Sequence, residues 1–417
     1  MMQTNQAMQS AAERQRVVIT GIGIVSPAGN WPGTVFENVA AARSAIRLLP
    51  QGERPTPVQV AAFIDGELDS GAASSDRVTQ LALAAGRRAL EQAGLLDQPE
   101  LLREMAVHLG TGSGGNATQD AAFHRLYAEG KDRLAPMSLP RGMMNGAASE
   151  LALRYGMMGE NNTYAVACAS SSAAIGEGLR AIRHGYAERI LAGGSEALLT
   201  FGVLHAWHAL RALANADADV AASCRPFSLD RTGLVLGEGA AFLVLESLAA
   251  AQARGALILA ELAGFGSSCD ASHLTHPSSP GQVRAIEAAL RDAGMQADQI
   301  DYVNAHGTAT AAGDATEAES LRTVFGARAE KLPVSSTKAV HGHLMGAGGA
   351  LELALSILAM QHDTIPPTAN CRQPDPAMGI DVVAEGARQQ TLNAVMSNSF
   401  AFGGSNNVLI ARRFIAD

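Results

Sequence analysis

Short apolar segments that end in glycine alternate with helical segments along most of this chain, and this alternation constrains the fold most. Residues 16–23 have the pattern of a buried strand that runs into glycines, and residues 76–93 carry apolar side chains at helical spacing before Gly94. The pattern predicts further strands at 105–109, 163–167, 189–192, 240–245, 300–305, 332–335, 392–397 and 407–412, and helices at 281–294 and 349–360. Strands that alternate with helices predict an α/β fold.

The pattern of strand, glycine-rich end and helix occurs in two similar parts. We predict a flexible leader over residues 1–15, an N-terminal half over 16–259 and a C-terminal half over 260–417. No linker rich in proline or serine separates the halves, so we expect them to pack as one body.

Composition excludes several classes of protein. The chain is 47% hydrophobic, which excludes disorder, and its net charge of −9 argues against a nucleic-acid binder. Four cysteines in 417 residues do not make a disulfide scaffold. The N-terminus lacks the apolar core of a signal peptide, and no run of eighteen apolar residues suggests a membrane span. We therefore predict a cytoplasmic protein that does not enter a membrane.

Cys168 is the first candidate for chemistry. It lies between a predicted strand and a helix that opens with small residues, where the positive end of the helix dipole favours a thiolate. The alternative is a buried structural cysteine, which is the usual role of a free thiol. We interpret the other three cysteines as structural.

Histidines near two strand ends are the next candidates. His306 follows one strand, while His341 and His343 follow Lys338 closely. His341 and His343 have the spacing of metal ligands, but no third ligand has supporting spacing, so no metal is predicted. Together with Cys168, His306 and His343 form a thiol and imidazole set of the kind that activates thiols.

Three acidic residues and one lysine have both structural and functional interpretations. Lys338 fits a solvated surface lysine and Glu352 the exposed face of a helix, but if both are buried they need each other. Asp314 and Glu317 have the spacing of a capping box at a helix start, and we interpret them as structural.

Glycine-rich turns at two strand ends raise the possibility of nucleotide binding. Gly21 and Gly23 lack the third glycine of the dinucleotide fingerprint, and the glycines from Gly110 onward have the wrong spacing. No phosphate-binding loop of the type Gly-x-x-x-x-Gly-Lys-Ser/Thr occurs. The sequence therefore predicts neither dinucleotide nor phosphate binding.

Five motifs in one order resemble those of the elongating beta-ketoacyl-acyl-carrier-protein synthases of the thiolase superfamily. They are VACASS at 166–171, NAHGTAT at 304–310, SSTK at 335–338, GHLMGAGG at 342–349 and NSFAFGGSN at 398–406. The resemblance runs from about Arg16 to the C-terminus. It implies a five-layered αβαβα fold built from two similar halves and a dimer.

The resemblance also implies a role for each matched residue. Cys168 would be the acylated nucleophile, and His306 and His343 would support decarboxylation of a malonyl thioester. Lys338 would pair with Glu352 and set the charge around the histidines. The remaining implied roles are an oxyanion hole from the backbone N–H groups of Cys168 and Phe400, a gate at Phe400, contacts of Thr308 and Thr310 with phosphopantetheine, and an acyl pocket with Ser113 and Phe402. No metal or organic cofactor is implied beyond the phosphopantetheine that carries the substrates.

Several positions depart from the pattern of housekeeping members of the family. Ser113 stands where a bulky aliphatic residue is common, so the acyl pocket is expected to be longer or more polar. Arg133 and Arg211 are our candidates for docking an acyl carrier protein, with ordinary surface charge as the alternative. These departures suggest a specialised ketosynthase, for a polyketide or polyene, that forms a homodimer or pairs with a ketosynthase-like subunit.

Two other functions stay open at this point. A priming acyltransferase would use Cys168 without chain extension, and a non-catalytic subunit would shape the product of a partner. His306, His343 and Lys338 together favour condensation, and Cys168 argues against a non-catalytic role.

Overall fold

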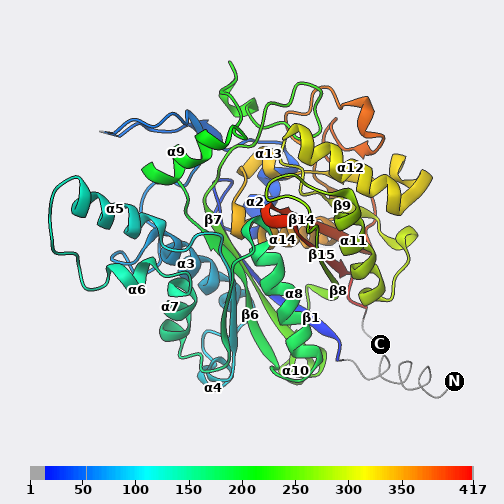
Figure 1. Cartoon of the computed structure of the whole chain (residues 1–417). Helices are drawn as coiled ribbons and strands as arrows, with labels where there is room; N and C mark the ends of the chain where they lie inside the picture. The colour runs from blue at the N-terminus through cyan, green and yellow to red at the C-terminus, as the bar shows by residue number, and fades with distance from the viewer. Residues whose placement is uncertain (1–14, 53, 416–417) are drawn as a thin grey trace.

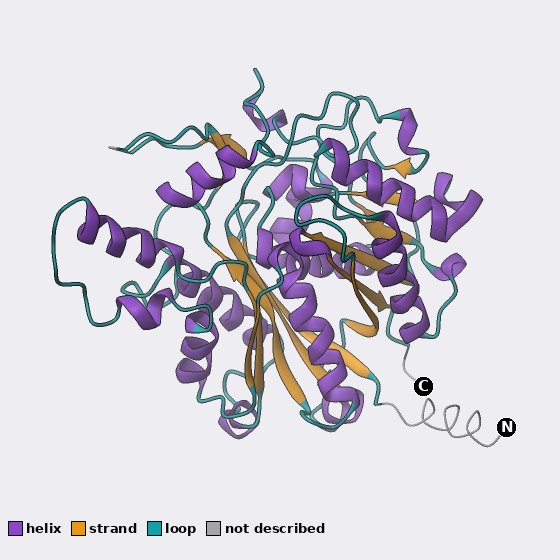
Figure 2. Cartoon of the chain, viewed as in Figure 1, coloured by secondary structure: helices purple, strands orange, loops and turns teal. Residues whose placement is uncertain are grey.

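The computed structural model describes residues 15–52 and 54–415, which form a mixed α/β fold around one large sheet. The sheet has 11 strands in the order β12-β10-β9-β14-β15-β8-β1-β7-β6-β4-β5. Figure 2 shows this sheet with helices on both of its faces. The predicted leader lies almost wholly outside the described residues.

The first half contributes the strands β1 (Val17–Val25), β4 (Ala106–Gly110), β5 (Asn161–Tyr164), β6 (Arg189–Glu196) and β7 (Gly239–Ser247) to the large sheet. Its helices include α2 (Pro32–Ala40), α3 (Arg77–Gln92), α5 (Asn116–Tyr127), α6 (Ser138–Gly142), α7 (Gly146–Tyr155), α8 (Ser170–Arg183), α9 (Phe201–Leu210) and the short 3-10 turn η1 (Ala167–Ala169).

The second half contains β8 (Ala260–Cys269), β9 (Tyr302–Asn304), β10 (Pro333–Ser335), β12 (Asp381–Val382), β14 (Ala394–Ala401) and β15 (Ser405–Arg412). Its helices and turns include α11 (Ser279–Ala293), α12 (Ala311–Phe325), α13 (Lys338–His341), η5 (Met345–Ala347), α14 (Gly348–Gln361) and η7 (Phe402–Gly404).

The two halves of the sheet repeat one strand order. The first reads β1-β7-β6-β4-β5 and the second β8-β15-β14-β9-β10, with β12 added at the edge. Pairing directions also repeat, because β4 and β9 each have two parallel neighbours among these strands while β7 and β15 each have two antiparallel ones. The prediction of two similar halves within one α/β fold is confirmed, whereas the division into separate units at 259/260 stays a prediction.

In each half, a glycine of one strand lies in close contact with the backbone of the covering helix, at equivalent positions. A Cβ on Gly23 of β1 would lie 2.0 Å from the carbonyl oxygen of Ala85 in α3, and one on Gly266 of β8 would lie 2.0 Å from that of Ala285 in α11. Only glycine permits such an approach of a helix to a strand backbone. These two glycines inside the strands therefore set the spacing between layers.

Five layers result from this packing. Helix α3 covers one face of the first half-sheet, α11 covers the outer face of the second, and α12 packs against α11. Helices α8 and α14 contact each other and lie between the half-sheets, where α14 contacts β7 and β14 (Figure 1). The central layer thus brings residues from both halves together.

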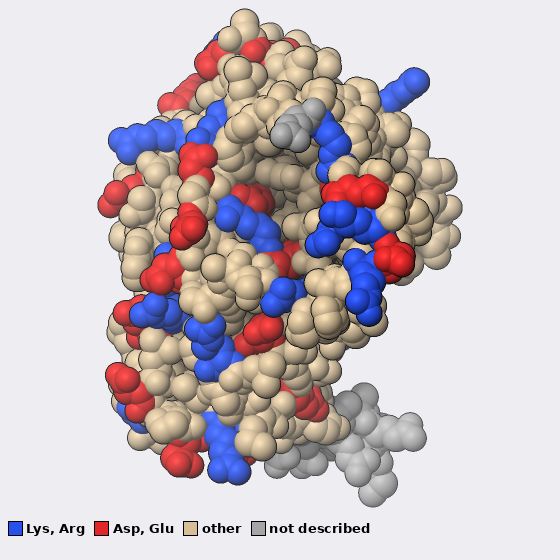
Figure 3. All heavy atoms as spheres, turned by 90° about the vertical axis from the view of Figure 1, so that its left-hand side faces the viewer, with Lys and Arg blue, Asp and Glu red and all other residues tan. Residues whose placement is uncertain are grey.

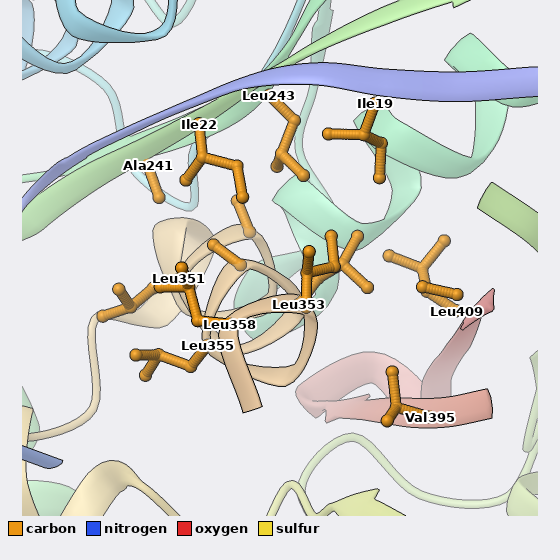
Figure 4. Packing of buried hydrophobic residues seen from close by; sticks show 14 of the residues in the cluster. Ile19, Ile22, Ala241, Leu243, Leu351, Leu353, Leu355, Leu358, Val395 and Leu409 are labelled. Atoms are coloured by element: carbon orange, nitrogen blue, oxygen red, sulfur yellow. The ribbon is translucent and has the colours of Figure 1, made fainter. Parts of the chain in front are cut away.

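Helix α14 is buried on all sides, as a helix in a central layer must be. Figure 4 shows Leu353 and its neighbours on α14 between Ile22 of β1 and Val395 of β14. Fully burying one leucine contributes about 1.5–3 kcal/mol. This apolar layer fixes the helix that begins at Gly348, directly after the loop with His343.

Among the described residues, no helix is long and apolar enough to span a membrane.

Candidate active site

Cys168 lies in the turn η1, directly before α8. The preceding Ala167 has φ = 49°, a left-handed conformation that is rare outside glycine. The hydroxyl of Ser170 supports this turn, because it donates to the carbonyl of Ala167 at 2.6 Å and accepts from the N–H of Val166 at 2.9 Å. The strained turn thus holds the thiol at the N-terminal end of the helix.

Two histidines from the second half face this thiol. His306 lies after β9, and His343 lies between α13 and η5. The Cys168 sulfur and one ring nitrogen of each histidine lie within 4.8 Å of one another. The imidazoles meet edge to face, with ring centroids 5.3 Å apart. The structure therefore brings together the three residues that the sequence nominated for thiol chemistry.

Both histidines are neutral in this setting. Burial, and after it the Lys338 ammonium, holds the pKa of His306 and of His343 well below the ordinary value of 6.5. The N–H of Met345 donates to Nδ1 of His343 at 3.3 Å, so the ring proton lies on Nε2. Nε2 is buried and has no partner among the described residues. His343 is therefore a neutral hydrogen-bond donor with an unused N–H.

The resting Cys168 is a thiol, in contrast to the expected thiolate. Burial raises the pKa of the Cys168 thiol to about 12, and the Lys338 ammonium opposes this only in part. Loss of hydration outweighs the helix dipole here because Cys168 is only 8% exposed. The expectation of a resting thiolate was wrong.

The backbone N–H groups that face the Cys168 sulfur are those of Cys168 and Phe402. The sequence assigned the second donor to Phe400, and this assignment was wrong. Phe400 still pairs with Asn406 inside the β14–β15 ladder, whereas Phe402 begins the turn η7 just past the strand end. The Phe400 ring instead lies against His306, with centroids 6.2 Å apart.

Lys338 and Glu352 form a buried ion pair behind the histidines. Each side chain is 1% exposed, and Nζ of Lys338 contacts Oε1 of Glu352. Burial raises the pKa of Glu352 to about 7, although the Lys338 ammonium lowers it. The sequence predicts that Lys338 and Glu352 need each other if both are buried, and the structure shows both buried and paired.

The family comparisons bear directly on this arrangement. Residues 14–251 match the protein family described as "Beta-ketoacyl synthase, N-terminal domain". Residues 259–372 match the family described as "Beta-ketoacyl synthase, C-terminal domain". The chain belongs to the beta-ketoacyl synthase family. It is a condensing enzyme of the acyltransferase type.

Similar proteins cover nearly the whole chain. Nodulation protein E of Rhizobium sp. (strain N33) is 39% identical over 96% of this chain and 99% of its own length. The 3-oxoacyl-[acyl-carrier-protein] synthase 2 of Staphylococcus aureus (strain COL) is 37% identical over 97% of this chain and 100% of its own. The solved ishigamide ketosynthase/chain length factor matches with a TM-score of 0.90 and 34% identity, covering 96% of this chain and 100% of that chain.

A cavity of about 420 Å³ opens onto the site of this condensing enzyme. The predicted residues that line it are Cys168, His306, His343, Thr308, Thr310, Phe400, Phe402 and Arg211. The hydroxyls of Thr308 and Thr310 lie 3.0 Å apart beside the histidine turn. Ser113 and Arg133 do not line this cavity, and Arg133 lies in an exposed segment between α5 and α6.

The capping-box interpretation of Asp314 and Glu317 was wrong. Thr310 is the N-cap of α12, and both carboxylates lie inside the helix and are buried. Glu317 accepts from the N–H groups of His306 and Gly307 at 2.9 and 2.8 Å. Asp314 accepts from the N–H of Ala309 in the same turn at 3.1 Å and from the N–H of Phe227 at 2.7 Å. The two carboxylates therefore hold the turn that carries His306, a role that sequence reasoning missed.

His341 has a structural role in the loop. Its Nδ1 lies 2.7 Å from the carbonyl oxygen of Gly342, and its Nε2 lies 3.0 Å from the Thr337 hydroxyl. Burial lowers the pKa of His341 to about 3. Both ring nitrogens are engaged within the loop, so His341 does not take part in the cluster around Cys168.

Sequence reasoning also missed two residues of the site, Glu196 at the end of β6 and Met345. Glu196 accepts backbone N–H groups from both halves, and the sulfur of Met345 lies 3.6 Å from that of Cys168. Glu196 ends a strand with Gly193-Gly194-Ser195-Glu196, and only the position of an acid at a glycine-rich strand end could have drawn attention to it.

Proposed function

We propose that this enzyme joins a malonyl group to an acyl group held on Cys168, in a decarboxylative Claisen condensation on an acyl carrier protein. The observation that supports this most is the buried thiol with two neutral imidazoles within 4.8 Å. Neutral imidazoles can hold a thioester carbonyl without adding a charge to a dry site.

The first step is transfer of the acyl group. The sulfur of Cys168 attacks the carbonyl of the acyl thioester, the bond to the pantetheine sulfur breaks, and that sulfur takes the proton of the thiol. A thiol with a pKa of about 12 is deprotonated only as the new bond forms. The start of α8 and the two N–H groups at the sulfur stabilise the negative charge that develops.

The second step is condensation. The Nε2–H of His343, with His306 beside it, holds the thioester carbonyl of the malonyl group while carbon dioxide leaves. The enolate carbon attacks the acyl–Cys168 carbonyl, and the N–H groups of Cys168 and Phe402, which lie at the sulfur, are the proposed donors to the oxygen that becomes negative. One such donor is worth about 3–4 kcal/mol in comparable enzymes. The Cys168 sulfur then leaves as a thiolate and takes up a proton from solvent water.

Lys338 and Glu352 act through the histidines in this proposal. The ammonium of Lys338 is the second cause, after burial, of the lowered pKa of both rings. The pair therefore keeps the rings neutral, and the Glu352 carboxylate keeps Lys338 buried.

Substrates reach the site on phosphopantetheine through the cavity, and no other cofactor is proposed. We propose that Thr308 and Thr310, which line the cavity, hydrogen-bond this arm, and that Phe400, packed against His306, acts as a gate. Arg211 at the cavity and Arg133 outside it stay our candidates for carrier docking. On the face shown in Figure 3, basic and acidic side chains are interspersed, so docking there relies on local charges. We propose the cytoplasm as the location of this reaction.

A second copy or a ketosynthase-like subunit is the proposed partner. Exposed apolar side chains project from α5, α6 and the segment after α6, namely Phe123, Tyr127, Leu139 and Met143. A group of exposed apolar side chains marks a protein interface. The likeness to the ishigamide ketosynthase/chain length factor favours, as a second candidate, a polyketide or polyene ketosynthase with such a subunit. The priming acyltransferase is the third candidate.

The test is a product assay with acyl-carrier and malonyl-carrier proteins of several chain lengths. We expect a 3-oxoacyl product two carbons longer than the acyl donor, released with one carbon dioxide. Acyl transfer without extension would support the priming acyltransferase. Extension only after a ketosynthase-like subunit is added would support the second candidate.

A further inference from the structure

Glu196 is a buried carboxylate that the steps above do not use. It is 0% exposed at the end of β6, and no basic side chain among the described residues pairs with it. Its hydrogen bonds come from the N–H of Gly112 at 2.6 Å, the N–H of Gly346 at 3.0 Å and the Thr111 hydroxyl at 3.2 Å. Burial raises the pKa of Glu196 to about 7. Burying a carboxyl group without a paired cation costs free energy, and hydrogen bonds must offset this cost. The groups that donate to Glu196 therefore indicate its role.

The loop that Glu196 holds is the one that contacts the reacting groups. Gly346 donates to Glu196, and the adjacent Met345 has φ = 45°, a strained conformation for a residue with a side chain. Met345 donates its N–H to Nδ1 of His343, and its sulfur lies 3.6 Å from that of Cys168. The position of Met345 thus sets the tautomer of His343.

The loop has little room to relax while this carboxylate is in place. A Cβ on Gly346 would lie 2.4 Å from the nitrogen of Gly112 and 2.6 Å from Oε2 of Glu196. Oε2 of Glu196 accepts from both glycines, one in each half of the chain. The carboxylate therefore joins the halves at the loop beside Cys168.

From these contacts we infer that Glu196 is a positioning residue for condensation. Its carboxylate pins the Met345–Gly346 turn, and the pinned Met345 N–H keeps the proton of His343 on Nε2, where it meets the malonyl thioester. This inference rests on the proposed function for its effect on catalysis. The effect on the tautomer of His343 does not depend on that function.

The inference predicts unequal losses in the two half-reactions. Glu196→Ala removes both backbone contacts, so Met345 relaxes and His343 loses its fixed tautomer. Acylation of Cys168 needs no donor on His343. Burial, and after it the Glu196 charge, raises the pKa of the Cys168 thiol, so removal of that charge does not hinder deprotonation, and we expect the acylation rate to fall no more than about threefold below wild type. Misplacing a catalytic group by about 1 Å can reduce a rate by about a hundredfold, so we expect condensation to fall by about ten- to a hundredfold.

The experiment measures each half-reaction in a single turnover. Acylation is followed by the mass of the intact protein, and condensation by product formed when malonyl-carrier protein is added to enzyme already acylated. The tautomer of His343 is read from ¹⁵N chemical shifts in protein labelled at histidine, with its signals assigned by their loss in His343→Gln. Glu196→Gln keeps an oxygen for the two N–H groups, so we expect a smaller loss of condensation and an unchanged tautomer.

Glu246 provides the matched control. It is also 0% exposed and lies on the neighbouring strand β7, but it pairs with Arg189 and Arg254. Glu246→Gln is expected to lower stability without separating the two half-reactions.

Equal losses of acylation and condensation in Glu196→Ala would overturn the inference, as would ¹⁵N shifts of His343 that match wild type. If Glu196→Ala does not fold, Glu196→Leu decides, because it fills the space but accepts from neither N–H, and equal losses of acylation and condensation in it would overturn the inference too. If wild-type protein forms no condensation product, the proposed function fails, while the ¹⁵N shifts still test the positioning role.

Discussion

Replacing Lys338 with methionine tests the electrostatic account of the site. The side chain keeps most of its length but loses the ammonium that pairs with Glu352. Both residues are 1% exposed, and Oε2 of Glu352 has no partner among the described residues. Removing one partner of a buried pair destabilises a protein by about 3–5 kcal/mol, because the other charge stays buried and unpaired.

The size of this effect depends on pH, and its sign follows from the Glu352 carboxyl. Burial holds the pKa of Glu352 at about 7, against an ordinary value of 4.5. A carboxyl with a raised folded pKa loses stability as pH rises through that pKa, by about 1.4 kcal/mol per pH unit. Without Lys338 the pKa of Glu352 rises further, so the variant goes on losing stability between pH 7 and 9. We expect the stability difference from wild type to grow by up to about 3 kcal/mol between pH 6 and pH 9.

The assay is urea unfolding followed by circular dichroism at pH 6, 7.5 and 9. The matched control is the double variant Lys338→Met/Glu352→Leu, which buries no charge. We expect its stability difference from wild type to vary much less with pH. A stability difference for Lys338→Met that is the same at pH 6 and pH 9 would refute the reasoning.

The remaining predictions concern the reaction and its pocket. Cys168→Ala is expected to keep the fold, by circular dichroism, and to lose chain extension, and normal extension would contradict its role. His306→Ala is expected to slow decarboxylation more than acylation in single-turnover assays, and equal slowing would rule out this division of roles. Ser113 does not line the cavity at Cys168, so its place in the acyl pocket rests on the family resemblance. On that basis Ser113→Ile is expected to shorten the longest acyl chain accepted in a competition assay, and unchanged selectivity would remove Ser113 from the pocket. Gly346→Ala places a Cβ 2.4 Å from the Gly112 nitrogen, so we expect condensation to fall sharply while acylation is largely kept.

Local sequence signals predicted the strands and helices that build the layers. The strand expected over 16–23 is observed as Val17–Val25, with its two glycines inside a buried run, and the helix expected over 76–93 is observed as Arg77–Gln92 because its apolar spacing and Gly94 mark both its face and its end. The strand expected over 240–245 is observed as Gly239–Ser247. Such features depend on neighbours in sequence, so periodicity detects them.

Contacts between distant segments could not be predicted in this way. Asp314 and Glu317 have the spacing of a cap, but one of the two N–H groups from which Asp314 accepts belongs to Phe227, 87 residues away. Phe400 and Phe402 fall on the same side of an extended strand, so the sequence alone does not show which one follows the strand end. Burial of Cys168 is likewise a property of the whole fold, and it reversed the expected charge state of the thiol.

Mass spectrometry of the intact protein after exposure to acyl-carrier protein shows whether Cys168 is the residue that carries the acyl group. The account predicts one added acyl group, mapped by peptide analysis to Cys168, that disappears when malonyl-carrier protein is added and a product two carbons longer forms. The exposed Cys269 provides an internal control and should stay unmodified. An acyl group on another residue, or none under conditions that yield the elongated product, would contradict the account.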